Sequence, residues 1–403
     1  MKYQNTKYLV MLCDGMADYP IDELNKRTPL EAADVPCMDS LAKTAEVGLL
    51  KTVADGMKPG SDVANLSVLG YDPKECYTGR SPLEAGSIGI DMTDTDVALR
   101  CNLVTLTDEP NYADRTILDY CAGDIHTHDA KILIEYLAEH LNDGEFKFYA
   151  GVSYRHCLIW NNGSLDVRLT PPHDITGKAI ADYLPQPDKL FELMKKSYAL
   201  LKDHPVNKER IAKGLAPANS IWLWGEGTKA KLENFSDKFG ISGSMISAVD
   251  LLKGIAKFSG MNVVEVDGAT GYIDTNFEGK ANAAIEEFKK GQELVYIHVE
   301  APDECGHRGE VSKKVRSLEL IDRLVLAPVV EYLKNSGDFK VLVTADHATP
   351  LVLKTHTNDP VPYLIYDSTA EQSGVGEFNE KTAAETGKYI AEGCSLMRHF
   401  INS

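Results

Sequence analysis

Three continuous apolar runs in the chain each stop at or just before acidic or histidine residues. The runs are 7–13, 294–299 and 341–344, and the polar residues that follow them include Asp14, Asp303, Asp346 and His347. Short, uninterrupted apolar runs are typical of parallel strands that are buried on both faces. The pattern therefore predicts three buried strands with polar residues at their carboxyl ends.

Helical spacing of apolar residues predicts helices between and around these strands, over 246–258, 280–290 and 313–333. Strands that alternate with helices favour an α/β core with a mostly parallel sheet sandwiched by helices. In such sheets ligands bind at the carboxyl ends of the strands. We therefore expect the polar strand ends to meet in one site although they are far apart in the sequence.

The middle of the chain has a different pattern. It predicts strands over 100–106, 146–160 and 165–169, a helix over 129–141, and a loop-rich stretch between Gly225 and Gly243. We interpret 95–178 as a small inserted α/β domain. The core is then formed by 1–94 and 179–403.

Composition narrows the classes of function. The chain has 403 residues, 43% of them apolar and 25% charged, with a formal net charge of −18. This is a globular composition, and the acidic balance disfavours nucleic acid as a partner. No apolar run approaches the roughly 18 residues of a membrane span, and Asp14 interrupts the first run before it resembles a signal peptide. We expect a cytoplasmic protein that has no membrane partner.

The polar strand ends, together with two nearby histidines, form a candidate metal-binding set. Asp303 and His307 are four residues apart, Asp346 and His347 are adjacent, and His356 follows nine residues later. With Asp14 the set has three carboxylates and three imidazoles, a mixture that suits Mn²⁺ or Zn²⁺ better than Mg²⁺ or Ca²⁺. Six ligands exceed the need of one catalytic ion and indicate two. Each pair alone is more typical of ordinary surface or loop residues than of a metal site.

A serine lies at the start of a predicted helix over 62–69. Ser61 follows the turn formed by Pro59 and Gly60, where helix N–H groups and the helix dipole favour a phosphoryl group. The alternative is that Ser61 only caps the helix. Beside two metal ions it becomes a candidate nucleophile. Asn65, one turn further along, is placed to reach the same phosphoryl oxygens.

Several motifs, taken together, resemble one enzyme family over nearly the whole chain. They are Asp14-Gly, Gly60-Ser61-Asp-Val-Ala-Asn65, Asp303-x₃-His307, Asp346-His347, His356, and the segments 77–85, 268–275 and 298–303. The combination resembles the cofactor-independent phosphoglycerate mutases of the archaeal type, within the alkaline phosphatase superfamily. The resemblance implies an isomerase of glycolysis and gluconeogenesis that interconverts 3-phosphoglycerate and 2-phosphoglycerate without a diphosphoglycerate cofactor.

The resemblance also implies roles for individual residues. One metal ion would be bound by Asp303, His307 and His356, and the other by Asp14, Asp346, His347 and Ser61, with Ser61 becoming phosphoserine. Mn²⁺ is the ion that we expect, with Zn²⁺ or Mg²⁺ as alternatives. The segment 122–128 is similar to a histidine-containing segment of the longer bacterial relatives and suggests His126 as a general acid or base. Those relatives end their serine motif in His, where this chain has Asn65.

The implied substrate is a small phosphorylated molecule that carries a carboxylate. Arginine side chains bind both groups well, and the candidates are Arg155 and Arg80, with Lys280 as a further cation. The inserted domain would act as a substrate-binding lid. Three alternatives stay open: a homoserine kinase-like phosphotransferase, a metal-dependent phosphatase and a non-catalytic binding protein. The sequence does not predict an oligomeric state.

Overall fold

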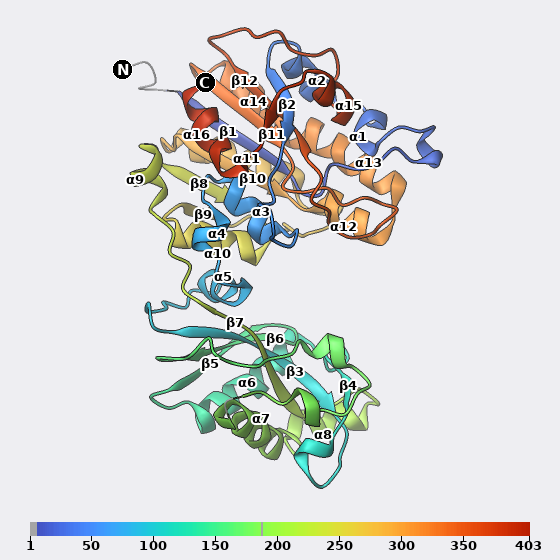
Figure 1. Ribbon diagram of the computed structural model, residues 1–403, viewed down its shortest axis with the longest axis vertical. Helices are drawn as coiled ribbons and strands as arrows, with labels where there is room; N and C mark the ends of the chain where they lie inside the picture. The colour runs from blue at the N-terminus through green and yellow to red at the C-terminus, as the bar shows by residue number, and fades with distance from the viewer. Residues whose placement is uncertain (1–5, 187) are drawn as a thin grey trace. The chain divides into compact units, whose positions relative to one another are not determined.

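The computed structural model describes residues 6–186 and 188–403, which form two compact units (Figure 1). Unit 1 contains residues up to Tyr77 and Lys231–Ser403, and unit 2 is Thr78–Ala230. The second unit is thus larger than the predicted insertion over 95–178. The structure adds 78–94 and 179–230 to the predicted insertion. A strand at 220–228 pairs along the strand at 97–106, and helices from both added segments pack on this sheet.

Among the described residues, unit 1 is built on a sheet of eight strands. In spatial order they are β13 (Tyr389–Ile390), β2 (Glu46–Leu50), β12 (Val361–Asp367), β11 (Phe339–Thr344), β1 (Lys7–Cys13), β10 (Leu294–Val299), β8 (Gly243–Ile246) and β9 (Asn262–Val264). β1 lies between β10 and β11 and is parallel to both. Of these described strands, only β12 runs antiparallel to both of its neighbours. The predicted, mostly parallel sheet is therefore confirmed.

Helices accompany this sheet throughout unit 1. They are α1 (Pro29–Ala32), α2 (Pro36–Ala42), α3 (Ser61–Val68), α4 (Pro73–Cys76), α9 (Phe235–Phe239), α10 (Asp250–Phe258), α11 (Phe277–Lys289), α12 (Ala301–Arg308), α13 (Val311–Leu320), α14 (Ala327–Lys334), α15 (Glu380–Glu385) and α16 (Leu396–Asn402). Every residue of β10 and β11 is buried, so the sheet centre is covered on both faces.

The central strands end at the same level. Cys13 at the end of β1 pairs with Val299, and Leu12 pairs with Thr344, the last residue of β11. Because the strands are parallel, the residues that follow them leave the sheet at one edge. This register brings Asp14 next to the start of helix α12, which carries Asp303 and His307, and next to the start of the loop that carries Asp346, His347 and His356.

Two predicted helices differ from the observed ones. The segment 313–333 is helical, but a π-helical turn, Ile321–Leu326, separates α13 from α14. Within this turn Asp322 accepts hydrogen bonds from the N–H groups of Cys37 and Met38 at the start of α2. The helix predicted from Ile246 begins only at Asp250, because Gly243–Ile246 pairs with β10 as strand β8.

Unit 2 has a smaller antiparallel sheet. Its strands are β4 (Ile117–Asp119), β3 (Val97–Leu106), β6 (Arg155–Trp160) and β5 (Phe146–Val152), with β7 (Ser220–Thr228) also paired to β3. Its helices are α5 (Arg80–Ser87), α6 (Thr127–Leu141), α7 (Asp188–Leu201) and α8 (Pro205–Ala212). α6 and α7 contribute their apolar faces to a core that also includes Trp160 and Trp222.

Three predictions for unit 2 are wrong. The segment 146–160 is not one strand but two, β5 and β6, which pair antiparallel across a turn. The segment 165–169 is not a strand, and only Arg168 forms an isolated bridge, with Gln186. The stretch expected to be a loop from Gly225 begins inside β7. The pairing of β7 with β3 shifts register at Ala98 to Arg100, and Gly225 has a φ of +67° there. This glycine therefore marks a β-bulge within a strand, not the start of a loop.

No helix in the described part of the chain combines the length and apolar character needed to cross a membrane.

Candidate active site

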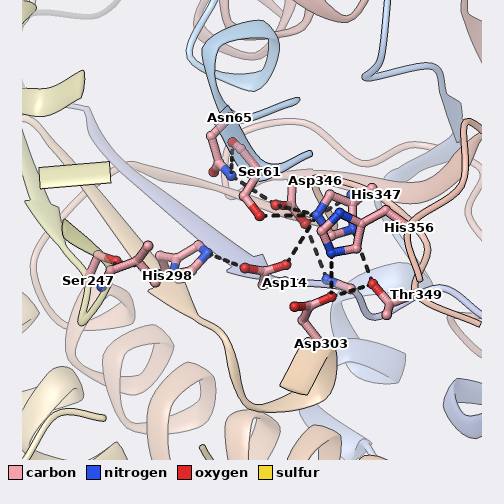
Figure 2. Close-up of polar contacts among 12 residues, drawn as sticks. Asp14, Ser61, Asn65, Ser247, His298, Asp303, Asp346, His347, Thr349 and His356 are labelled. Atoms are coloured by element: carbon pink, nitrogen blue, oxygen red, sulfur yellow. Dashed lines mark hydrogen bonds and ion pairs between the residues drawn. The ribbon is translucent and has the colours of Figure 1, made fainter. Parts of the chain in front are cut away.

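Ser61 is the first residue of α3. The N-cap position is taken by Gly60, which has an extended backbone, so the Ser61 hydroxyl does not serve as the cap of this helix. Instead, Ser61 Oγ lies 3.1 Å from His347 Nε2 (Figure 2). Ser61 is partly exposed, whereas the following residues of the helix, 62–68, are buried. The local fold thus presents one hydroxyl, at the positive end of a helix, to the predicted metal ligands.

The three carboxylates of the predicted ligand set converge on His347 (Figure 2). Its Nε2 lies 3.6 Å from Asp14 Oδ1 and 3.4 Å from Asp346 Oδ2. Donor atoms of these three residues form one group within 4.8 Å of one another, and those of Asp303, His347 and His356 form a second. His347 belongs to both groups, so the structure brings the ligands together without dividing them into the two separate sets that the resemblance implies.

His307 completes the second group of donors. Its Nε2 lies 3.2 Å from Asp303 Oδ2 and 2.9 Å from His356 Nε2. Its other ring nitrogen, Nδ1, lies 3.0 Å from the carbonyl oxygen of Lys354. A carbonyl only accepts, so Nδ1 carries a proton. The hydrogen bond with Asp303 raises the pKa of His307 to about 9, and a cation bound at Nε2 would displace the second proton. A backbone carbonyl that orients the imidazole in this way is common behind metal-binding histidines.

The donor set fits a divalent cation. Asp14 Oδ1 is buried and has no hydrogen-bond partner among the described residues, and a buried carboxylate oxygen without a partner is costly. It points into the cluster beside His347. Burial, followed by the charges of Asp346 and Asp303, raises the pKa of Asp14 well above its usual range. A cation bound between these carboxylates would relieve the same repulsion that raises this pKa.

The loop between β11 and β12 carries His347 and His356 and is anchored at several points. Thr349 Oγ1 donates to Asp303 and lies 3.2 Å from His347 Nδ1. The carbonyl of Thr349 accepts from Lys314 Nζ at 2.8 Å, and this fully buried ammonium is also paired with Asp18 at 2.7 Å. The loop is thus held by an ion pair that is protected from solvent, which limits its freedom to move the two histidines.

Gly15 is required by the close approach of two ligands. Its φ is +62°, and a Cβ at this position would lie 2.7 Å from Asp303 Cα and Cβ. We expect Gly15→Ala to lower the free energy of unfolding by roughly 2–4 kcal/mol, combining left-handed strain with overpacking. We also expect it to displace Asp303 and reduce metal binding. Urea denaturation and metal analysis measure the two effects.

Gly56→Ala is the matched control for this substitution. Gly56 also has a positive φ, of +85°, but no atom of the described residues lies within 4 Å of the place that an added methyl group would take. We expect a loss of about 1 kcal/mol, from strain alone. Equal losses for both variants would contradict the role given to the Gly15–Asp303 contact.

Asn65 has a supporting position among the predicted site residues of unit 1. It is fully buried, and its Nδ2 donates to Asp346 Oδ2 and to the Ser61 carbonyl, both at 2.9 Å. Its Oδ1 accepts from the Tyr296 hydroxyl at 2.7 Å. Because both amide hydrogens have partners, Asn65 orients Asp346 here, and the predicted contact with phosphoryl oxygens stays a prediction.

Lys280 is buried rather than exposed to solvent. Its Nζ donates to the carbonyl of His298 at 3.1 Å, and burial lowers the pKa of this lysine to about 8. Glu300, which follows β10, has a pKa raised by burial to about 8. The predicted contact between Lys280 and the substrate stays a prediction.

The other predicted site residues lie in unit 2. His126 is exposed at the N-cap of α6, and Arg155 is exposed at the start of β6, with its guanidinium 5.1 Å from the centre of the Tyr154 ring. The hairpin turn before Arg155 is hydrogen-bonded to the two sequence neighbours of His126, Ile125 and Thr127. The hydroxyl of Ser153 donates to the Ile125 carbonyl, and its backbone N–H donates to the hydroxyl oxygen of Thr127. Arg80 is the exposed first residue of α5.

Comparisons with known proteins identify the family. A family model described as 2,3-bisphosphoglycerate-independent phosphoglycerate mutase matches residues 42–207. A relative from Geobacter sulfurreducens, named as a probable enzyme of this kind, is 46% identical over 98% of this chain and 100% of its own length. The chain belongs to the 2,3-bisphosphoglycerate-independent phosphoglycerate mutase family. A Methanosarcina barkeri mutase is 49% identical over 94% of this chain and 95% of its own length.

Solved structures agree with this membership of the mutase family. A protein from Pyrococcus horikoshii has a TM-score of 0.83 and 28% identity, covering 99% of this chain and 97% of that one. A cofactor-independent phosphoglycerate mutase from Thermoplasma acidophilum has a TM-score of 0.72 and 25% identity, covering 98% and 99%. The two-unit fold is therefore shared with a named mutase along almost its whole length.

Residues around the ligands were not found from the sequence. Thr349 contacts Asp303 and His347, and Ser247 contacts His298, which in turn contacts Asp14. Thr349 lies two residues after a predicted ligand, a weak signal that could have drawn attention to it. Ser247 has no comparable signal, because it is distant in sequence from every predicted ligand.

Proposed function

We propose that this chain is a 2,3-bisphosphoglycerate-independent phosphoglycerate mutase that interconverts 3-phosphoglycerate and 2-phosphoglycerate through a phosphoserine at Ser61. The observation that carries the proposal is the 3.1 Å approach of Ser61 Oγ to His347 Nε2 within a cluster of buried carboxylates and imidazoles. Membership of the mutase family supports the choice of substrate. A small phosphorylated molecule is therefore the expected ligand.

The cluster would hold two divalent cations, which we propose to be Mn²⁺. The ligands are Asp14, Asp303, His307, Asp346, His347 and His356, with Ser61 beside them. Bound cations of this kind favour ionisation of a hydroxyl and neutralise the oxygens of a phosphoryl group during in-line transfer. The mixed oxygen and nitrogen donors favour Mn²⁺ or Zn²⁺ over Mg²⁺.

The reaction has two balanced transfers. Ser61 Oγ loses its proton and bonds to phosphorus while the bond from phosphorus to the 3-oxygen breaks, and this oxygen gains a proton as glycerate forms. The 2-hydroxyl of the retained glycerate then loses its proton and bonds to phosphorus, the bond to Ser61 Oγ breaks, and Ser61 Oγ regains a proton. The positive end of α3 favours both the ionised and the phosphorylated serine.

Groups from unit 2 complete the proposal. His126 would exchange protons with the glycerate hydroxyls, for which an imidazole is suited near neutral pH. Arg155 and Arg80 would bind the carboxylate and the phosphate. Retention of glycerate between the two transfers requires that water is excluded from phosphoserine, and we assign this role to unit 2.

A coupled assay tests the function. The purified chain is incubated with 3-phosphoglycerate and Mn²⁺, without 2,3-bisphosphoglycerate, and enolase reports 2-phosphoglycerate as it forms. We expect turnover that does not require bisphosphoglycerate. Release of phosphate without 2-phosphoglycerate would instead make the protein a phosphatase, and phosphorylation of homoserine with no action on phosphoglycerate would make it a kinase.

Arg155→Ala tests substrate binding by unit 2. We expect the KM for 3-phosphoglycerate to rise roughly 10–100-fold, because a charge-assisted hydrogen bond to the substrate is lost. The metal content should not change. Arg168→Ala is the matched control, because Arg168 is also exposed in unit 2 and donates to a backbone carbonyl, that of Asp182. Kinetic constants that are the same for both variants and the wild type would remove Arg155 from the proposal.

A further inference from the structure

Asp14 is hydrogen-bonded on the side away from the other ligands to a chain of two residues (Figure 2). His298 Nε2 lies 2.9 Å from Asp14 Oδ2, and His298 Nδ1 lies 3.2 Å from Ser247 Oγ. The three residues come from the carboxyl ends of neighbouring strands. His298 is in β10, Ser247 directly follows β8, and Asp14 directly follows β1. Because β8, β10 and β1 are parallel neighbours, strand pairing places these three residues next to one another. We call this hydrogen-bonded chain of Ser247, His298 and Asp14 the relay.

The hydrogen bonds determine which ring nitrogen of His298 carries the proton. Ser247 Oγ accepts from the N–H of Val249 at 3.0 Å, so its own hydrogen is available to donate to His298 Nδ1. In the metal-bound form Asp14 is ionised and its carboxylate only accepts, which requires a hydrogen on His298 Nε2. His298 and Ser247 are both buried, with 0% and 4% of their surface exposed. The arrangement therefore selects a neutral imidazole that accepts at Nδ1 and donates at Nε2.

This donation leaves the two oxygens of Asp14 in different situations. Oδ2 is engaged by His298, whereas Oδ1, beside His347, has no hydrogen-bond partner in the described part of the chain. A neutral donor orients the carboxylate without cancelling its charge, so the full charge remains for a cation at Oδ1. Asp346 is also oriented by neutral donors, but both of its oxygens accept: Oδ1 from the N–H groups of Gly15 and His347, and Oδ2 from Asn65.

We propose that Ser247 and His298 are positioning residues that orient Asp14 for metal binding. The inference rests on the proposed two-metal function and adds to it two residues that do not touch the substrate. Loss of the relay should therefore lower the cation affinity of the group formed by Asp14, Asp346 and His347. The cation affinity of the group around Asp303 and His356 should stay the same. Loss of partners behind metal ligands typically lowers affinity by roughly 10–100-fold.

The test is a Mn²⁺ titration of the full chain after chelation, followed by electron paramagnetic resonance of the free ion. For the wild type we expect two bound ions. For His298→Leu we expect one of the two affinities to fall roughly 10–100-fold, and for Ser247→Ala, which keeps the imidazole, roughly tenfold. His298→Gln, which keeps an N–H donor, should recover at least part of the loss.

Ser244→Ala is the matched control. Ser244 is buried in β8, the strand that Ser247 directly follows, but its hydroxyl donates to Glu287 at 2.7 Å, away from Asp14. We expect its Mn²⁺ titration to match the wild type. Two tight sites in both Ser247→Ala and His298→Leu would overturn the relay while leaving the proposed function standing. A wild type that binds no Mn²⁺ would overturn the metal centre itself. If His298→Leu does not fold, Ser247→Ala still decides the question.

Discussion

Ser61→Ala is expected to lower phosphoglycerate turnover by at least roughly 10⁴-fold, the scale of losing a covalent nucleophile. Ser61 Oγ is the hydroxyl placed 3.1 Å from His347 Nε2, at the start of α3. The six carboxylate and imidazole ligands are unchanged by this substitution, so the bound metal should stay close to the wild-type content. Coupled turnover and metal analysis on the same preparation measure both effects.

Ser67→Ala is the control for Ser61→Ala. Ser67 lies in the same helix, but its hydroxyl is buried and donates to the Val63 carbonyl at 3.2 Å. We expect a stability loss of about 1 kcal/mol and nearly normal turnover, because this hydroxyl does not reach the ligands. If Ser61→Ala retained turnover like that of Ser67→Ala, the phosphoserine scheme would have to be abandoned.

Removal of divalent cations is expected to abolish turnover and to destabilise unit 1. Without a cation, burial and the neighbouring carboxylates disfavour the ionised form of Asp14, whose pKa is raised. A cation that binds only the folded chain adds about 2.7 kcal/mol to the free energy of unfolding at a concentration 100 times its Kd. Thermal unfolding and turnover, measured after EDTA treatment and after addition of Mn²⁺, should therefore recover together.

Substitution of a histidine ligand tests whether the stability and activity restored by Mn²⁺ come from the metal cluster. In His307→Ala the Nε2 atom next to Asp303 and His356 is lost, so Mn²⁺ should restore much less stability and activity than in the wild type. His140→Ala is the control, since His140 is exposed on α6 and contacts the Tyr136 carbonyl. Full turnover by protein shown to be free of divalent cations would contradict the metal centre.

The sequence predicted the sheet centre because its signal is local. The apolar runs that became β1, β10 and β11 are bounded by polar residues, and parallel pairing in one register places those residues at one edge. The same logic brought Asp14, Asp303 and Asp346 together. It also placed Ser61 at a helix start, although the structure was needed to exclude the N-cap role, which Gly60 has.

The limits of unit 2 could not be predicted in the same way. The pairing of β7 with β3 joins residues more than a hundred positions apart, and Gly225 within β7 resembles a loop signal. The segment 165–169 has the residue types of a strand but bridges only Gln186, through Arg168. Strand pairing at such distances depends on tertiary packing more than on local propensity.

The support behind the ligands was also hidden in the sequence. His298 lies in an apolar run and is buried, but its hydrogen-bond partners are Asp14 and Ser247, which the sequence does not indicate. Nothing in the local pattern of Ser247 links it to either residue. For Asn65 the sequence predicts a contact with phosphoryl oxygens, which stays a prediction, but gives no sign of the hydrogen bond that its amide donates to Asp346. Side chains that act through another side chain become visible only when the strands are assembled.

The central claim is that Ser61 carries the phosphoryl group between the two hydroxyls of glycerate. The most direct measurement is mass spectrometry of the chain after rapid acid quenching during turnover of 3-phosphoglycerate with Mn²⁺. The account predicts one phosphoryl group on the peptide that contains Ser61, and none on that peptide in Ser61→Ala. Steady turnover with Ser61 unmodified at every quench time, or with the phosphoryl group on another residue, would contradict it.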